Sequence, residues 1–230
     1  MISSSRQCIL AAFADMVRTM KILTVSDTVV PGIYDTSIQE RYSDVDLVLG
    51  CGDLPNYYLE FIVTMLNKPL YYVFGNHDEN VTYTNKGPKR VEPGGCVNLD
   101  RRTVNYKGLL LAGLEGSMRY KKGGGPQYTD QEMWLKTLSL VPCLLQNRLR
   151  YGRFLDILIT HAPPYSIHDA SDLCHTGFKA FLWLMKHFQP RYLLHGHIHL
   201  YGHYPSRRTM YESTLVINTY GRHILKWEGQ

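Results

Sequence analysis

The chain has 230 residues, of which 44% are hydrophobic and 20% are charged, and its formal net charge is +5. This is the composition of a soluble globular protein of one α/β domain or two small ones, and no apolar run approaches the about 20 residues that span a bilayer. The basic pairs at 101–102, 121–122 and 207–208 are scattered, so they do not indicate a nucleic-acid-binding face, although a mild positive field favours an anionic substrate.

Residues 1–19 differ from the rest of the chain. The polar start ISSSRQ is followed by CILAAFADMVR, which could form an amphipathic helix. Asp15 interrupts this short apolar stretch and no small-residue cleavage site follows, which disfavours a signal peptide. Translation could also begin at Met20. We therefore predict an N-terminal extension over residues 1–19 without a catalytic role, and a single domain over residues 20–230.

Three apolar strands are predicted in the first third of the chain, at 21–26, 45–50 and 70–74. Between the second and the third, Asn56 could cap a helix whose apolar residues repeat at helical spacing as far as residue 66. A strand, a helix and a strand within about 30 residues indicate a parallel βαβ unit.

The middle of the chain contains glycine and proline turns. Residues 81–108 are predicted to be loop with short strands near 95–100 and 102–106, and a buried strand follows at 109–112. The glycine-rich segment 117–128 lacks the residue pattern of a phosphate-binding P-loop. We expect it to be a substrate-side or mobile loop.

Thr129 and Glu132 form a capping box that opens a helix. Pro142 is expected to break this helix and to start a second one, whose inner face would carry Leu144, Leu145 and Leu149. The remaining predicted elements are a strand at 155–160, a helix capped by Thr176 and stopped by Pro190, a strand at 192–195 and antiparallel strands at 214–218 and 223–227.

The buried strands end in residues of metal-ligand type: Asp27, Asp53, Asn76, His77, His161, His197 and His199. Ligands in open α/β sheets bind outside the carboxyl ends of the strands. Oxygen donors mixed with imidazoles suit a pair of divalent transition ions such as Mn, Fe or Zn, which can clamp a phosphate between them. His197 and His199 alternate, so both project to one side of an extended segment. Any one of these residues could be a turn former or a structural histidine, but their recurrence at strand ends favours a metal site.

Two other sets of residues are less specific. The five cysteines are widely spaced and include no CxxC pair, which favours a reducing, cytoplasmic location over a disulfide framework or a structural zinc site. The loop after His161 carries polar residues that could line a substrate pocket, although a solvated loop is the simpler interpretation: His168, Asp169, Asp172 and His175. His195 would face away from the metals and pack in the core.

Four motifs, GCGD (50–53), GNHD (75–78), THAPP (160–164) and GHIH (196–199), resemble those of the calcineurin-like metallophosphoesterases. Their order and spacing match from residue 21 to the end of the chain. The resemblance implies an α/β fold, a four-layer α/β/β/α sandwich of two mixed sheets with the metals at the strand ends. It also implies two divalent transition metals as cofactors and a small phosphorylated substrate.

The resemblance assigns a role to each site residue by its position. Asp53 would bridge the two metals. Asn76, His161 and His197 would complete one metal site, whereas Asp27 and His199 would belong to the other. His77 would stabilise the phosphoryl oxygens or protonate the leaving group, and Asp78 would orient His77, because a carboxylate fixes the tautomer of an imidazole.

One position departs from the family pattern. The first motif of the family is Asp-x-His, but here Asp27 and Thr28 are followed by Val29, which cannot ligate. Tyr34, Asp35 or water could take the place of the missing imidazole. The occupancy of the first metal site is therefore the open point of the resemblance.

We expect a metal-dependent phosphohydrolase acting on a phosphodiester, with in-line attack on phosphorus by a metal-activated hydroxide. The alternative is a catalytically weak or inactive protein-interaction scaffold of the same fold, which the valine at position 29 would permit. A nuclease would need a contiguous basic groove, which the sequence does not show. Substrate identity depends on loops such as 80–95 and 117–128, and the sequence determines neither the substrate nor the oligomeric state.

Overall fold

A computed structural model describes residues 19–78, 81–84, 87–121, 125–200 and 206–229. The predicted N-terminal extension therefore lies outside the described residues, except for Thr19, which is the first residue of strand β1 (Thr19–Ser26). None of the helices in the described ranges combines the length and the apolarity that crossing a bilayer requires.

The first sheet has five strands in the order β15-β1-β2-β3-β6. Strand β1 lies between β15 (Gly221–Glu228), which is antiparallel to it, and β2 (Leu47–Cys51), which is parallel. Strands β3 (Leu70–Val73) and β6 (Val97–Asn98) extend the parallel part. The predicted parallel βαβ unit is thus confirmed as β2, helix α3 (Asn56–Leu66) and β3.

The second sheet has six strands in the order β13-β14-β12-β11-β8-β7. Its centre is parallel and consists of β14 (Thr214–Asn218), β12 (Tyr192–His195), β11 (Ile157–Thr160) and β8 (Leu109–Leu114). The antiparallel edges are β13 (Arg208–Tyr211) and β7 (Thr103–Tyr106). Strand β14 was predicted to be antiparallel to its neighbours. It is antiparallel to β13, but the prediction was wrong for β12, with which β14 pairs in parallel.

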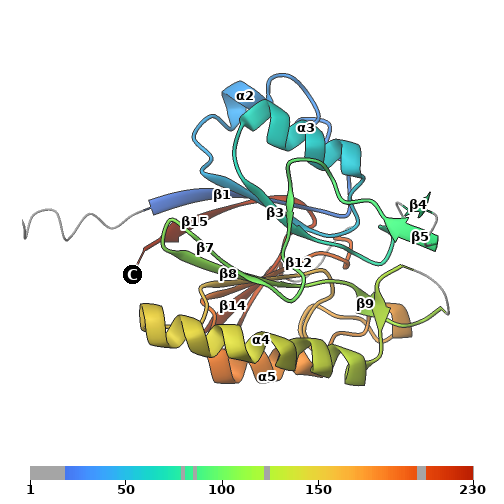
Figure 1. The fold of residues 1–230 in the computed structure, drawn as a ribbon, viewed down its shortest axis with the longest axis vertical. Helices are drawn as coiled ribbons and strands as arrows, with labels where there is room; N and C mark the ends of the chain where they lie inside the picture. Colours follow the sequence, from blue (N-terminus) through green and yellow to red (C-terminus); the bar gives the residue numbers. More distant parts are fainter. Residues whose placement is uncertain (1–18, 79–80, 85–86, 122–124, 201–205, 230) are drawn as a thin grey trace, which may run out of the picture.

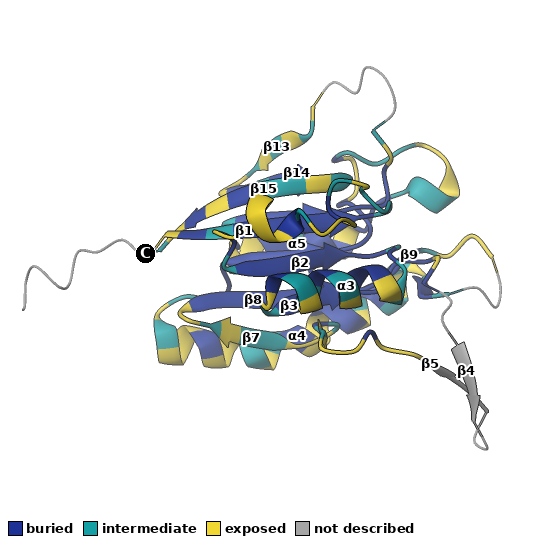
Figure 2. Ribbon diagram, turned by 90° about the horizontal axis from the view of Figure 1, so that it is seen from above, coloured by how far each residue is buried: buried dark blue, intermediate teal, exposed yellow. Residues whose placement is uncertain are grey.

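The two sheets face each other, and helices cover their outer faces (Figure 1). Helices α2 (Ile38–Arg41) and α3 lie on the first sheet, and α4 (Asp130–Tyr151) and α5 (Lys179–Phe188) lie on the second. Three apolar clusters separate the four layers, and the central strands between them, such as β2 and β8, are wholly buried (Figure 2). This arrangement confirms the predicted four-layer sandwich of two mixed sheets.

Helix α4 does not break at Pro142, contrary to the prediction. It begins at the predicted capping box of Thr129 and Glu132 and continues without interruption to Tyr151. A proline inside a helix costs about 3 kcal/mol through its missing N–H and its ring, but Pro142 lies on the exposed face, where the unpaired carbonyl of Leu138 can bind water. Leu144 is buried as predicted, whereas Leu145 and Leu149 point outward.

The other two predicted caps are also different in the structure. The residue before α3 is Pro55, and Asn56 is the first helical residue, whose side-chain amide donates to the carbonyl of Val91. Helix α5 begins after Phe178 rather than at Thr176. Asn56 binds the carbonyl of Val91, and Phe178 packs in the apolar cluster on the second sheet. Both partners are distant in the sequence, so no local signal marks these helix starts.

Short strands occur in the segments that were predicted to be loop. Strands β4 (Val81–Thr84) and β5 (Gly87–Arg90) form an antiparallel hairpin. Strands β9 (Ser117–Met118) and β10 (Gln127–Tyr128) pair in parallel at the two ends of the glycine-rich segment. These segments project beyond the strand ends at the same side of the molecule (Figures 1 and 2).

Candidate metal centre

Three of the predicted ligands stand at sharp turns directly after strands. Asp27, Asp53 and His197 have φ values of 65°, 54° and 68°, in the left-handed region that L-residues other than glycine rarely adopt. Such a conformation costs of order 1 kcal/mol or more for each residue and persists only where the surrounding structure enforces it. The sharp turn at each of these strand ends is therefore held by the surrounding structure, as it is at several other turns of the described chain.

Glycines next to these ligands leave room for their side chains. A Cβ atom on Gly196 would lie 2.5 Å from Oδ2 of Asp27, and one on Gly52 would lie 2.5 Å from Nδ1 of His161. Gly52 also has a φ of 89°. The glycines of the GCGD and GHIH motifs are thus required by close approach of the ligand side chains.

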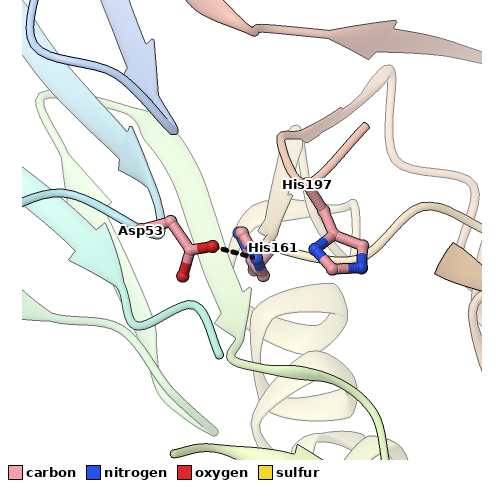
Figure 3. Close-up of side chains that lie close together, drawn as sticks. All are labelled: Asp53, His161 and His197. Carbon is pink, nitrogen blue, oxygen red and sulfur yellow. Dashed lines mark ion pairs between the residues drawn. The ribbon is translucent and has the colours of Figure 1, made fainter. Parts of the chain in front are cut away.

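The two sheets bring Asp53, His161 and His197 together (Figure 3). Asp53 follows β2 of the first sheet, whereas His161 and His197 follow β11 and β12 of the second. One ligand atom of each residue lies within 4.8 Å of those of the other two. Oδ2 of Asp53 is 3.3 Å from Nε2 of His161. A carboxylate and two imidazoles at these separations form a donor set suited to a divalent transition ion.

His161 is fully buried, and acceptors face both of its ring nitrogens. Nδ1 lies 2.9 Å from the carbonyl oxygen of Cys51, and Nε2 lies 2.9 Å from Oδ1 of Asn76. Burial by itself lowers the pKa of His161. The Asp53 and Asp27 carboxylates together outweigh burial and raise this pKa to about 9. Burial by itself raises the pKa of Asp53, but the positive charge of His161 outweighs burial and lowers this pKa to about 2. The oxygen atoms of Asp53 and Asn76 thus favour a positive charge at the position between them and His161.

The surroundings of Asp27 also indicate that the site suits metal ions. Its side chain is fully buried, and Oδ1 accepts a 2.7 Å hydrogen bond from the backbone N–H of His197. Oδ2 is buried without a hydrogen-bond partner among the described residues, and burial raises the pKa of the carboxyl group. An unpaired buried carboxylate oxygen is costly, and a cation would satisfy it. Nε2 of His199, whose ring lies beside that of Tyr220, is 4.0 Å from Oδ1.

Asp78 holds the backbone around the site. Its carboxylate accepts hydrogen bonds from the N–H groups of Asp53 at 2.9 Å, Leu54 at 3.0 Å and Gly75 at 2.6 Å. Burial, followed by the neighbouring Asp53 charge, raises the pKa of Asp78 to about 6. These bonds tie the GCGD turn to the GNHD turn, which is a different role from the predicted orientation of the His77 ring.

His77 is exposed at the rim of the site. Its backbone N–H donates to Oδ1 of Asp53 at 2.8 Å, which places the residue beside the carboxylate predicted to bridge the metals. The imidazole is therefore accessible to a ligand, and its role in proton transfer stays a prediction.

The candidates for replacing the imidazole missing at position 29 do not reach the site. Val29 packs against the apolar cluster beneath α3. Tyr34 stacks on the outer surface of α3, with ring centroids 5.5 Å from Tyr57 and 4.7 Å from Phe61. Asp35 is exposed and accepts from the N–H of Ser37. The suggestion that Tyr34 or Asp35 could substitute as a ligand was wrong, because both side chains serve local packing and turn formation.

Sequence reasoning missed three contacts around the ligands. Nδ2 of Asn76 is 3.4 Å from the hydroxyl oxygen of Tyr120. Nε2 of His197 is 2.7 Å from the carbonyl oxygen of Cys174. His195 is buried as expected, and its Nε2 pairs with Nδ1 of His168 at 2.9 Å. The polar residues in the loop after His161 were the available signal for the contacts of His197 and His195. These two histidines lie after and in β12, far from that loop in the sequence.

Comparisons with known proteins agree with this geometry. The family model "Calcineurin-like phosphoesterase" matches residues 20–201. The chain is 25% identical over 196 residues to the "uncharacterized protein MJ1162" of Methanocaldococcus jannaschii, covering 80% of this chain and 82% of that protein. Among solved structures, TT1561 of Thermus thermophilus superposes with a TM-score of 0.58 at 14% identity, covering 92% of this chain and 99% of that one. Another solved structure superposes with a TM-score of 0.61 at 12% identity, covering 93% and 100%.

Proposed function

Because the chain belongs to the calcineurin-like phosphoesterase family, whose members are metal-dependent phosphoester hydrolases, we propose that it is a phosphodiesterase with a dinuclear metal centre. The observation that carries the proposal is the meeting of Asp53, His161 and His197 from two different sheets, beside the buried, unpaired carboxylate oxygen of Asp27. A fold alone does not imply a function, whereas a converging donor set with unpaired charge has a specific chemical use.

The residues would divide between two ions, with Asp53 available to both. Asn76, His161 and His197 would hold one ion, and Asp27 and His199 would hold the other. When bound, the ions would supply positive charge to the phosphoryl oxygens and lower the pKa of the attacking water. Because Val29 contributes no donor, an ion beside Asp27 would have fewer protein ligands than its neighbour.

The other groups of the site position the substrate and move protons. His77 is exposed and its backbone N–H binds Asp53, so its ring would donate a proton from a ring nitrogen to the leaving-group oxygen. Asp78 fixes the two turns that carry Asp53 and Asn76 through its three backbone hydrogen bonds. Tyr120, which contacts Asn76, would border the substrate on the side of the glycine-rich segment.

A diester preference is supported by the pairing of two basic residues, Arg119 next to Tyr120 in the chain and Lys136 on α4. Arg119 binds the carboxylate of Glu132 at 2.8 Å, and Lys136 binds that of Asp100 at 2.8 Å and that of Glu115 at 3.5 Å. These cations are already matched by carboxylates. The extra negative charge of a phosphomonoester dianion would therefore find less compensation here than the single charge of a diester.

An inactive scaffold is the weaker interpretation of the same residues. A scaffold does not require an unpaired buried carboxylate oxygen, which destabilises the folded state. The valine at position 29 affects only one of the two ions. We therefore retain the hydrolase proposal.

The test combines metal content with substrate choice. The purified chain would be analysed for bound metals and assayed, with added Mn²⁺, on bis(p-nitrophenyl) phosphate and on p-nitrophenyl phosphate at equal concentrations. We expect bound metal and a larger kcat/KM for the diester. A larger kcat/KM for the monoester would refute the diester preference alone. Absence of both metal and hydrolysis would refute the enzymatic function and favour the scaffold.

A further inference from the structure

Helix α4 carries an apolar stripe on its outward face. Positions 135, 138, 142, 145 and 149 are Leu, Leu, Pro, Leu and Leu. The exposed fractions of the leucines are 68%, 45%, 50% and 89%, and Pro142 is exposed as well. Single exposed apolar residues are common on monomers, but a continuous row along a helix marks an interaction site. Within the part of the chain that the structure describes, no element covers this row, which we call the α4 stripe (Figures 1 and 2).

The α4 stripe is separate from the face that α4 uses for folding. Met133, Leu140 and Leu144 are buried and pack α4 onto the second sheet. The stripe follows the alternating three- and four-residue spacing of a heptad seam, which is the pattern that packs one helix against another. A solvated helix face has no reason to keep this spacing. The sequence therefore specifies two apolar faces on one helix, of which the fold of a single chain uses one.

We propose that the α4 stripe binds the same stripe of a second copy of this chain, forming an antiparallel helix pair across a two-fold axis near residue 140. The pairing sets Leu135 opposite Leu145 of the copy and Leu138 opposite Pro142, and the symmetry repeats both pairs. A two-fold interface needs a surface that is complementary to itself. The stripe meets this condition at four of its five positions, and Leu149 falls opposite Gln131 of the copy.

The charges at the two ends of α4 favour the antiparallel direction. The first turn carries Asp130 and Glu132, and the last turn carries Arg148 and Arg150. An antiparallel pair brings each acidic end next to the basic end of the copy. A parallel pair would bring like charges and like ends of the helix dipoles together, which is unfavourable. A second copy of this helix therefore supplies a partner of the right shape and the right charge order.

The size of the stripe sets the expected affinity. From Leu135 to Leu149 the helix rises about 21 Å, so the contact is at the small end of specific interfaces, which bury about 800 Å² on each partner. We expect a reversible dimer with a Kd of order 1–10 μM. Such a dimer would form and dissociate within an accessible concentration range.

The experiment is sedimentation equilibrium of the full chain from about 0.5 to 200 μM, a range that brackets the expected Kd. We expect the mass to rise from that of one chain to that of two. The double variant Leu138→Glu/Leu145→Glu should raise the Kd at least about 100-fold, since it buries four carboxylates at the seam. Its matched control is Met210→Glu on β13, where the side chain is 60% exposed, and this change should leave the Kd unchanged. Leu135→Glu, at a more exposed position, provides a second test if the double variant does not fold.

A cross-link tests the direction of the pair. In the variant Leu135→Cys/Leu145→Cys, oxidation should join residue 135 of one copy to residue 145 of the other, as identified by peptide mass. A disulfide between the two residues at 135 would overturn the antiparallel arrangement. A full chain that stays monomeric at every concentration would overturn the proposal, whether the stripe then bound lipid vesicles, another protein or nothing. A dimer that both Leu135→Glu and the double variant leave intact would also overturn it.

Discussion

Nε2 of His197 lies 2.7 Å from the carbonyl oxygen of Cys174. A carbonyl only accepts hydrogen bonds, so this nitrogen carries the hydrogen and Nδ1 is left with its lone pair. Burial, followed by the charge of His161, lowers the pKa of His197 to about 3, which keeps the ring neutral. A neutral imidazole with one fixed N–H and one free nitrogen is the form that binds a metal. The segment Leu173–His175, the short helix η1, therefore orients a predicted ligand.

Asp172 is expected to support this orientation from outside the site. Its Oδ2 accepts from Sγ of Cys174 at 2.7 Å and from Nδ1 of His175 at 2.7 Å, which holds η1 in place. Asp172→Ala should weaken metal binding by less than the about 10–100-fold that follows loss of a group bonded directly to a ligand, because Asp172 acts through η1. Calorimetric metal titration would measure this, with Ser171→Ala as the control in the same loop. Unchanged affinity would show that η1 is held without Asp172.

Asp53→Asn should reduce both metal content and hydrolysis. The change removes the charge that the two ions would share and also the group that chiefly raises the pKa of His161. We expect turnover to fall at least about 100-fold. Elemental analysis of the purified variant, together with diester hydrolysis, would measure the two effects. Turnover at the level of the unmodified chain would exclude the bridging role of Asp53.

His77→Asn should separate catalysis from metal binding. The side chain is exposed, and only the backbone of His77 bonds to Asp53, so the substitution leaves that contact intact. Metal content should be unchanged, while turnover should fall about 10²–10⁴-fold, the range for a general acid. The comparison needs metal analysis and kcat on one preparation. Loss of metal from this variant would make His77 a ligand instead.

Unequal metal affinities are expected because Val29 stands at the histidine position of the Asp-x-His motif and supplies no donor. One ion should remain through purification, and a second should require added Mn²⁺ for full activity. Val29→His should tighten the weaker site by adding an imidazole ligand. Val30→His is the matched control, because it places an imidazole one residue beyond the Asp-x-His spacing. Two equally tight sites in the unmodified chain, measured by calorimetry, would contradict the prediction.

A chain that begins at Met20 should fold and bind metal as well as the full chain. Met20 is buried between the sheets, and no predicted ligand precedes it. Thermal unfolding and metal titration of the two chains would be compared. A shortened chain that is unfolded or metal-free would show that residues 1–19 are part of the domain.

The sequence alone determined the strands and the residues at their ends. The strand predicted at 192–195 has those bounds in the structure, and the GHIH motif with its two histidine donors follows it directly. Apolar runs of strand length and the glycine-containing turns after them are local signals. Because parallel strands place their carboxyl ends at one edge, this local pattern was sufficient to predict that these side chains meet, whereas the four-layer fold was predicted from the resemblance of the four motifs to a known family.

The tertiary structure determined the hydrogen-bond partner of each polar group in the site. Asp78 binds three backbone N–H groups rather than the neighbouring His77 ring, and His197 binds a carbonyl, a group that every residue possesses and that no sequence pattern marks. The face of α4 that carries Pro142 was likewise fixed by packing, because a proline ends a helix only where its missing N–H cannot be compensated. Pairings across long distances in the chain depend on the assembled layers, and these were beyond the reach of local propensity.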